Sequence, residues 1–192
     1  MINANIMEQN VLTKNMWNAA GKAGLALGAV STAYLFAGQW LAGNLEPATL
    51  WQQVVALILW AAKFGGCIWL MKFFMVKFAY ENSVTNKSIV FRMGMTIALL
   101  SAVVYSAIYL ANMLYISADY YDQIFQTVVE QVKPTLDSNS LTALEKVIGN
   151  LPQIMFVYNL IYCFLFGTVL SAILSRNIPS SLPQADNKTE EQ

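Results

Sequence analysis

Lys63 is the residue whose type and setting could do chemistry, because it is the only charged residue between positions 50 and 71. A lysine at the centre of a membrane helix costs about 2.5–3.5 kcal/mol on insertion scales, and an ion at that depth is a functional hypothesis by default. The chemistry it would supply is the binding of an anion, such as a lipid phosphate near the cytoplasmic leaflet. Three further cations, Lys72, Lys77 and Arg92, are expected to complete a basic inlet for that phosphate.

A structural explanation of Lys63 stays open beside the functional one. A long cationic side chain near the end of a membrane helix commonly extends to the interface and leaves its charge in water. The glycine pair that follows at once, Gly65 and Gly66, would help by letting the helix bend. In that case Lys63 binds no ligand.

The other polar residues indicate no catalytic, cofactor or metal site. The chain has no histidine, which is the commonest general base and metal ligand. None of the long apolar stretches contains a carboxylate, although proton-coupled transporters and intramembrane hydrolases usually need such groups at depth. The two cysteines, Cys67 and Cys163, are expected in different spans at different depths, so we expect neither a disulfide nor a metal site. The chain is therefore predicted not to be an enzyme.

The composition indicates that these residues lie in a membrane. Of the 192 residues, 57% are hydrophobic and 11% are charged, whereas about a quarter of the residues in a soluble domain are charged. Eleven basic residues balance eleven acidic ones. Because the net charge is zero, no nucleic-acid partner is expected. The expected surroundings are the lipid bilayer.

Four apolar stretches are each long enough to cross a bilayer as a helix, which takes about 20 residues. They lie at residues 21–41, 50–71, 91–114 and 151–174. They lack the alternation of a membrane β-barrel, so we predict an all-α polytopic membrane protein with a four-helix transmembrane domain over residues 17–176. A soluble helical protein is the rival interpretation, but almost no amphipathic sequence remains to cover its core.

The charges between the spans predict the orientation. If the spans alternate in direction, eight of the eleven cations fall on one side of the bilayer: Lys14, Lys22, Lys72, Lys77, Lys87, Arg92, Arg176 and Lys188. The positive-inside rule then places both termini in the cytoplasm. Residues 1–16 lack the apolar core of a signal peptide and become a cytoplasmic segment, while residues 177–192 become a disordered cytoplasmic tail.

The connection between the third and fourth spans, residues 117–150, predicts an amphipathic helical hairpin on the outer side. Apolar residues recur at helical spacing on both sides of Pro134: Tyr121, Ile124, Phe125, Val128 and Val132 before it, and Leu141, Leu144, Val147, Ile148 and Leu151 after it. Two interpretations stay open. The apolar stripe is either a docking surface for another protein, or the packing face of a connector that lies against its own bundle or the lipid headgroups.

Small residues at four-residue spacing predict where the helices approach closely, because close backbone contact is the usual device for helix pairing in lipid. The spacing includes Gly24 and Gly28 in the first span, and Gly167 and Ser171 in the fourth. It indicates packing within one bundle or, for the Gly24–Gly28 pair, homodimerisation through a GxxxG face.

Two amides, Asn112 and Asn159, fall in or near the apolar zone. Both are predicted in the outer halves of the antiparallel third and fourth spans. We therefore expect a hydrogen bond between their side chains, which would contribute about 1 kcal/mol. Their role is then structural.

With this layout the chain resembles a family of small bacterial membrane proteins, domain of unknown function 4199 (DUF4199). Four motifs carry the resemblance: GKAGLALG at residues 21–28, FRMG at 91–94, YISADYYDQI at 115–124 and SRN at 175–177. The family often has a proline shortly after the isoleucine of the third motif, where this chain has Ser117 and Ala118. The resemblance implies four helices in a bacterial inner membrane and no assigned activity. It also implies a partner class, since genes of the family often lie beside one for a polyprenyl-phosphate glycosyltransferase.

Two functional hypotheses follow. The first is a non-catalytic scaffold or accessory subunit, with a membrane glycosyltransferase as its partner. The second is a small homodimeric transporter or lipid translocator. Copurification of a second polypeptide would favour the first, and a self-dimer stabilised by its substrate would favour the second.

Overall fold

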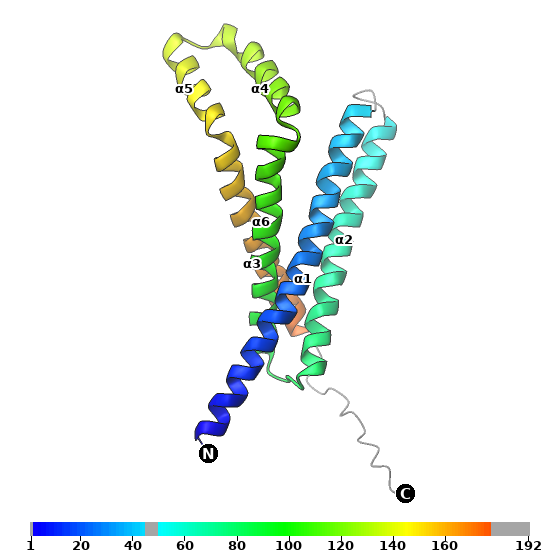
Figure 1. Cartoon of the computed structure of the whole chain (residues 1–192). Coiled ribbons are helices and arrows are strands. Elements are labelled where there is room, and N and C mark those ends of the chain that lie inside the picture. Colours follow the sequence, from blue (N-terminus) through cyan, green and yellow to red (C-terminus); the bar gives the residue numbers. More distant parts are fainter. Residues whose placement is uncertain (1, 45–49, 178–192) are drawn as a thin grey trace, which may run out of the picture.

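The structure is a computed structural model that describes residues 2–44 and 50–177 (Figure 1). Within these residues the chain is 94% helical and contains no β-strand, which confirms the predicted all-α class. Apart from Asn177, the predicted disordered tail lies outside the described residues.

Four helices are long and apolar enough to cross a membrane. They are α1 (Ile2–Asn44), α2 (Leu50–Glu81), α3 (Lys87–Ala111) and α6 (Leu151–Arg176). The third predicted span is completed by a short π-helix, Asn112–Ile116, that continues α3. Helix α1 also takes in residues 2–16, so the predicted N-terminal segment is part of the first long helix.

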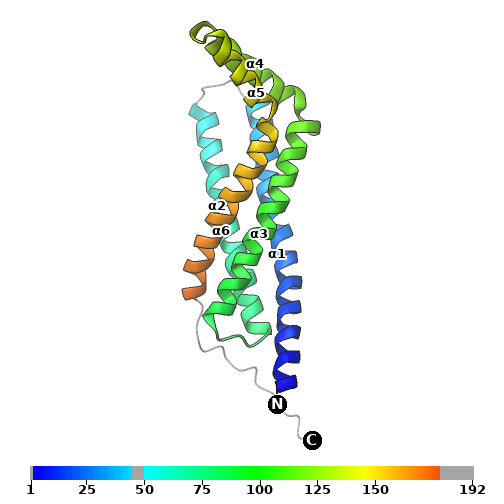
Figure 2. The same ribbon diagram turned by 90° about the vertical axis from the view of Figure 1, so that its left-hand side faces the viewer.

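The four long helices form an elongated bundle (Figures 1 and 2). Helix α1 packs against α2 and α3, and α3 packs against α6 along most of its length. Helices α1 and α3 run in the same direction, while α2 and α6 run the opposite way. The bundle thus has an N-terminal end, where α1 begins and α2 turns into α3, and a hairpin end, where α3 and α6 meet the connection between them.

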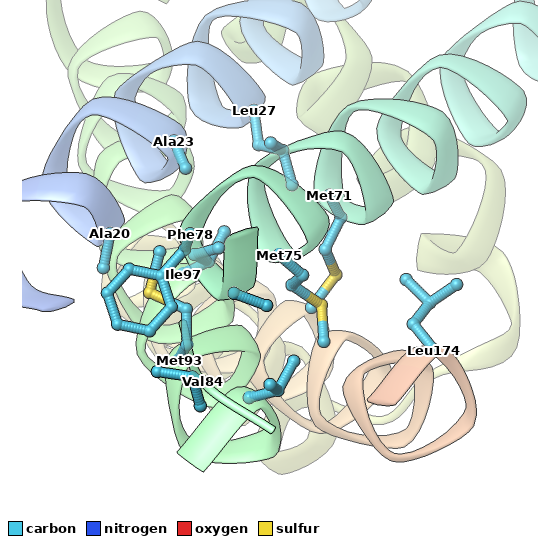
Figure 3. Packing of buried hydrophobic residues seen from close by; sticks show 12 residues of the cluster. Ala20, Ala23, Leu27, Met71, Met75, Phe78, Val84, Met93, Ile97 and Leu174 are labelled. Carbon is cyan, nitrogen blue, oxygen red and sulfur yellow. The ribbon is translucent and has the colours of Figure 1, made fainter. Parts of the chain in front are cut away.

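The apolar core lies at the N-terminal end, where α2 packs among the other three helices (Figure 3). The largest fully buried apolar side chains of α2 and α3 there are Met71, Met75, Phe78, Val90, Met93 and Ile97. Nearer the hairpin end, Leu57 and Ile58 of α2 are 65% and 61% exposed. Helix α2 is therefore anchored at one end and presents most of its other half to its surroundings.

Glycines make the close helix contacts, as their spacing predicted. A Cβ atom built at Gly24 would lie 2.7 Å from the Cβ of Leu100, and one at Gly28 would lie 2.6 Å from the Cγ1 of Val104. Carbon atoms do not approach this closely, so the α1–α3 interface requires both glycines. Helix α3 thus covers the GxxxG face that the sequence also offered for a homodimer.

The second small-residue ridge joins α3 to α6. A Cβ at Gly167 would lie 2.5 Å from the Cβ of Ala98, and the Ser171 side chain lies against Gly94. The Ser171 hydroxyl donates a hydrogen bond of 2.9 Å to the carbonyl oxygen of Phe91. All four predicted packing positions, Gly24, Gly28, Gly167 and Ser171, therefore lie in interfaces within one bundle.

A helical hairpin connects α3 to α6 and projects beyond the hairpin end of the bundle (Figures 1 and 2). It consists of α4 (Ala118–Val132), a 3-10 turn (Lys133–Thr135) and α5 (Ser138–Gly149). No residue of α4 or α5 is buried, and Ile124 and Val128 of the predicted apolar stripe are 39% and 44% exposed. The hairpin therefore does not bury its stripe against its own bundle.

Candidate functional site

The side chain of Lys63 points into the bundle. Its Nζ atom lies 4.7 Å from the centroid of the Tyr34 ring on α1 and 5.3 Å from the centroid of the Tyr105 ring on α3. A cation within about 6 Å of an aromatic face is attracted by the ring quadrupole, and the attraction strengthens when water is excluded. The ammonium of α2 is therefore held by rings from two other helices.

This ammonium borders a cavity of about 90 Å³ that all four long helices line. The polar side chains of the lining come from every one of these helices: Ser31, Lys63, Cys67, Ser101, Tyr105, Tyr162 and Cys163. The Ser31 Oγ and Cys67 Sγ atoms lie 4.0 Å apart, which links α1 to α2 beside the cavity. We call this space the Lys63 cavity.

The Lys63 cavity has the chemistry of an anion site. It combines one positive charge with hydroxyl and thiol groups that can donate hydrogen bonds. Among the described residues, no Asp or Glu lines this cavity. The ion pair found in the same part of the chain joins Lys77 to Glu81 and does not involve Lys63. An intramembrane cation is normally paired, so a cation met only by aromatic rings leaves its charge available to a ligand.

The Lys63 side chain turns towards two rings within the bundle, which favours the functional interpretation over snorkelling. Helix α2 continues without a break through Gly65 and Gly66, and a Cβ at either glycine would meet nothing within 4 Å. The glycines do not serve a close helix contact. The lysine side chain is directed at the Tyr34 and Tyr105 rings inside the bundle.

The structure does not bring the four predicted cations together. Lys72 is exposed, and Lys77 pairs with Glu81 at 3.8 Å and lines a separate crevice between α1 and α2 together with Lys22. Arg92 lines a third depression, on α1 and α3. With a rise of about 1.5 Å per residue, Lys77 lies roughly 21 Å along α2 from Lys63. The predicted basic inlet is therefore not one site.

Four residues of the site were not predicted from the sequence: Ser31, Tyr34, Ser101 and Tyr105. Ser31 and Tyr34 are three residues apart on α1, and Ser101 and Tyr105 are four apart on α3, so each pair shares a helix face. A search for polar residues at this spacing in neighbouring spans would have found them. The Gly24 and Gly28 contacts on α3 then set the two faces side by side.

The two cysteines also meet at this site, contrary to the expectation that they lie at different depths. Cys67 of α2 and Cys163 of α6 both line the Lys63 cavity, and both are free thiols. Their separation in sequence concealed this, because Cys67 and Cys163 belong to different helices that both line the cavity. Within the described residues, no group of three or more Cys, Asp or Glu side chains is placed to hold a metal ion.

A polar network holds α1 to the start of the hairpin. The Tyr121 hydroxyl accepts hydrogen bonds from the side-chain amides of Gln39 at 3.0 Å and Asn112 at 3.3 Å. The Ser117 hydroxyl donates to the Asn112 side-chain oxygen at 3.0 Å. The predicted hydrogen bond between Asn112 and Asn159 is wrong, because Asn112 turns to these partners of the π-helix and α4. The buried amide nitrogen of Asn159 has no partner among the described residues.

Comparisons of the chain with models of known families, with curated proteins and with solved structures find no match. The resemblance to the DUF4199 family therefore stays a prediction.

Proposed function

We propose that this chain is a multi-pass membrane protein whose helical bundle binds an anionic lipid at Lys63, and that it acts as a non-catalytic scaffold or accessory subunit. The observation that carries the proposal is the Lys63 ammonium, which lies inside the bundle over two tyrosine rings and beside a cavity without carboxylates in its described lining. Lys63 is half-buried, and a charge partly removed from water is costly unless it is compensated. A lipid phosphate supplies the missing negative charge.

The proposed setting is a bacterial inner membrane with both termini in the cytoplasm. Support comes from the four apolar helices, from the excess of cations at the N-terminal end and from the resemblance to DUF4199. The hairpin would then lie on the outer side. A reporter enzyme that is active only outside the cytoplasm should stay inactive when fused after Gln192, and strong activity would contradict this topology.

The accessory role is supported by the hairpin. Ile124, Val128 and Val147 of its apolar stripe are exposed. Its groove, lined by Phe125, Val129 and Ile148, also carries carboxylates, including those of Asp122 and Glu130. Such a surface suits contact with another membrane protein, and the proposed partner class is a polyprenyl-phosphate glycosyltransferase. Enzymes of that class act on a lipid phosphate, which is also the ligand proposed for the Lys63 cavity.

A lipid translocator is the second candidate, and the position of Lys63 along its helix favours it. Lys63 lies near the middle of α2, roughly 20 Å along the helix axis from Leu50. A phosphate held there would be midway between the leaflets. A homodimer for this role would need a surface other than the Gly24–Gly28 face, which α3 covers.

The amount of phosphatidic acid that the protein retains distinguishes binding at Lys63 from a general attraction between anionic lipid and exposed lysines. The purified protein in nanodiscs of phosphatidylcholine with a minority of phosphatidic acid should retain phosphatidic acid, as seen by native mass spectrometry. Lys63→Met should reduce that retention at least tenfold. The matched control is Lys72→Met, which removes an exposed lysine from the same helix and should leave retention unchanged. Equal retention by wild type and Lys63→Met would contradict the proposal.

A further inference from the structure

All four long helices line the cavity at Lys63, and α2 and α6 make few contacts with one another. Beside the cavity the contact between them is aromatic: the Phe64 and Phe166 rings meet edge to face with centroids 5.5 Å apart. Both rings belong to the cavity lining. These two rings thus form part of the cavity wall between α2 and α6.

The same wall is exposed on its outer side. Tyr162 and Phe166 of α6 line the cavity, yet they are 51% and 41% exposed. A side chain that both lines a cavity and lies on the surface marks an opening. The lining of the Lys63 cavity therefore reaches the surface of the bundle at Tyr162 and Phe166 of α6, on a face that would meet lipid chains.

An aromatic ladder runs from this opening towards the hairpin end. On α6 the Tyr158 and Tyr162 rings are stacked at 6.0 Å and the Tyr162 and Phe166 rings at 6.5 Å, each with 13° between the ring planes. On α2 the Trp60 ring lies 4.6 Å from Phe64. Parallel rings at four-residue spacing present a continuous flat apolar surface along one face of α6.

The ladder is not explained by the aromatic belts of membrane proteins. Belt tyrosines lie at headgroup level, where the hydroxyl reaches water. Tyr162 is roughly 17 Å along α6 from Leu151, near the middle of a helix 26 residues long. A row of rings at that depth therefore needs another explanation.

We propose that the ligand of Lys63 is a chain-bearing lipid phosphate that enters from the bilayer through the opening between α2 and α6. Its phosphate occupies the Lys63 cavity and its chain lies along Tyr158, Tyr162 and Phe166. This inference rests on the proposed function and adds the route and the ligand class. The cavity of about 90 Å³ has the volume of about three liquid water molecules, enough for a phosphate but not for a chain.

The chain must then lie outside the cavity. A lipid phosphate bound to Lys63 would leave its chain where the cavity lining reaches the surface, beside Tyr162 and Phe166. A soluble phosphate would need no such surface. Binding of a lipid phosphate should therefore depend on the aromatic ladder, whereas binding of a soluble phosphate should not.

The test compares two ligands and three variants by native mass spectrometry of the protein in phosphatidylcholine nanodiscs. The ligands are phosphatidic acid within the disc and inorganic phosphate in the buffer. Tyr162→Ala removes the centre of the ladder. Its matched control is Ile161→Ala, which removes a neighbouring side chain of α6 that is 52% exposed and lies outside the cavity lining. Lys63→Met reports on the site itself.

We expect retention of phosphatidic acid and not of inorganic phosphate, a fall of at least fivefold in Tyr162→Ala, and wild-type retention in Ile161→Ala. Two results would overturn the lateral route even if Lys63→Met loses binding. One is equal binding of inorganic phosphate, and the other is wild-type retention of phosphatidic acid in Tyr162→Ala. Equal losses in Tyr162→Ala and Ile161→Ala would overturn it as well. If Lys63→Met retains the lipid, the proposed function fails together with the route.

Discussion

Lys63 of α2 and Tyr105 of α3 face each other across the bundle, with the ammonium 5.3 Å from the centroid of the ring. A second ring, that of Tyr34 on α1, lies 4.7 Å from the same atom. One side chain thus joins three helices. Because aromatic rings stabilise a cation without neutralising it, the positive charge remains available for an anion.

The ring of Tyr105, and not its hydroxyl, should carry the contact with Lys63. We expect Tyr105→Leu to lower the free energy of unfolding by about 1–2 kcal/mol, because the cation–π contact and its packing are lost. Tyr105→Phe keeps the ring and should stay close to wild type. Unfolding in mild detergent, followed by circular dichroism, measures both. Equal losses in the two variants would contradict this assignment.

Gly28 is required for the contact between α1 and α3. Replacement by leucine would place side-chain atoms where Val104 already lies, and overpacking of this kind typically costs about 1–3 kcal/mol. Gly28→Leu should therefore lower the melting temperature of the purified protein. Gly38→Leu is the matched control on the same helix, since a Cβ there meets nothing within 4 Å. Similar melting temperatures for the two variants would rule out the tight α1–α3 interface.

The Tyr121 hydroxyl ties the first turn of α4 to α1 and to the π-helix. Tyr121→Phe removes the shared acceptor of Gln39 and Asn112, and should weaken this junction by about 1 kcal/mol. Amide hydrogen exchange over residues 118–124 should then become faster. The neighbouring variant Tyr120→Phe keeps both hydrogen bonds and serves as the control. Unchanged exchange in Tyr121→Phe would mean that the network does not hold the hairpin.

Asp137 makes the stability of α5 dependent on pH. Hydrogen bonds from the Ser140 hydroxyl and from the Ser140 backbone N–H, the latter at 3.1 Å, hold the pKa of Asp137 below its usual value. A lowered pKa in the folded state means that the stabilisation is complete above the unfolded pKa of about 4 and is lost as the pH falls through the folded value.

Helix α5 should therefore fray as the pH is lowered below about 4, which hydrogen exchange of residues 138–142 measures. Asp137→Asn keeps an N-cap acceptor without the charge, so its α5 should show little pH dependence over that range. Asp137→Ala should fray at every pH. A wild-type exchange rate that does not change with pH would contradict the assignment.

Much of the fold could be predicted from the sequence because it depends on patterns within one helix. The absence of charge over residues 93–111 and the single charge in 50–71 are local properties, and the helices α3 and α2 contain these stretches. The four-residue spacing of Gly24 and Gly28 likewise predicted a close contact. It did not reveal the partner, because α3 and a second copy of the chain would use the same face.

The site was predicted only in part because it depends on how helices are placed against one another. Lys63 is visible as a lone charge, but its ring partners Tyr34 and Tyr105 lie 29 and 42 residues away in the numbering. Asn112 and Asn159 illustrate the opposite error. The sequence predicted both amides at a similar depth. The Asn112 side chain instead bonds to Ser117, at the end of the π-helix, and to Tyr121 of α4, because these partners are nearer.

Photo-crosslinking tests the central claim most directly, since it records where a lipid phosphate lies in the intact protein. A phosphatidic acid with a diazirine in its acyl chain is irradiated in nanodiscs, and the labelled peptides are mapped by mass spectrometry. We predict labels concentrated on α6 around Tyr162 and Phe166 and on α2 around Phe64, and their loss in Lys63→Met but not in Lys72→Met. Labels spread evenly over the exposed faces of all four long helices, and unchanged in Lys63→Met, would contradict the account.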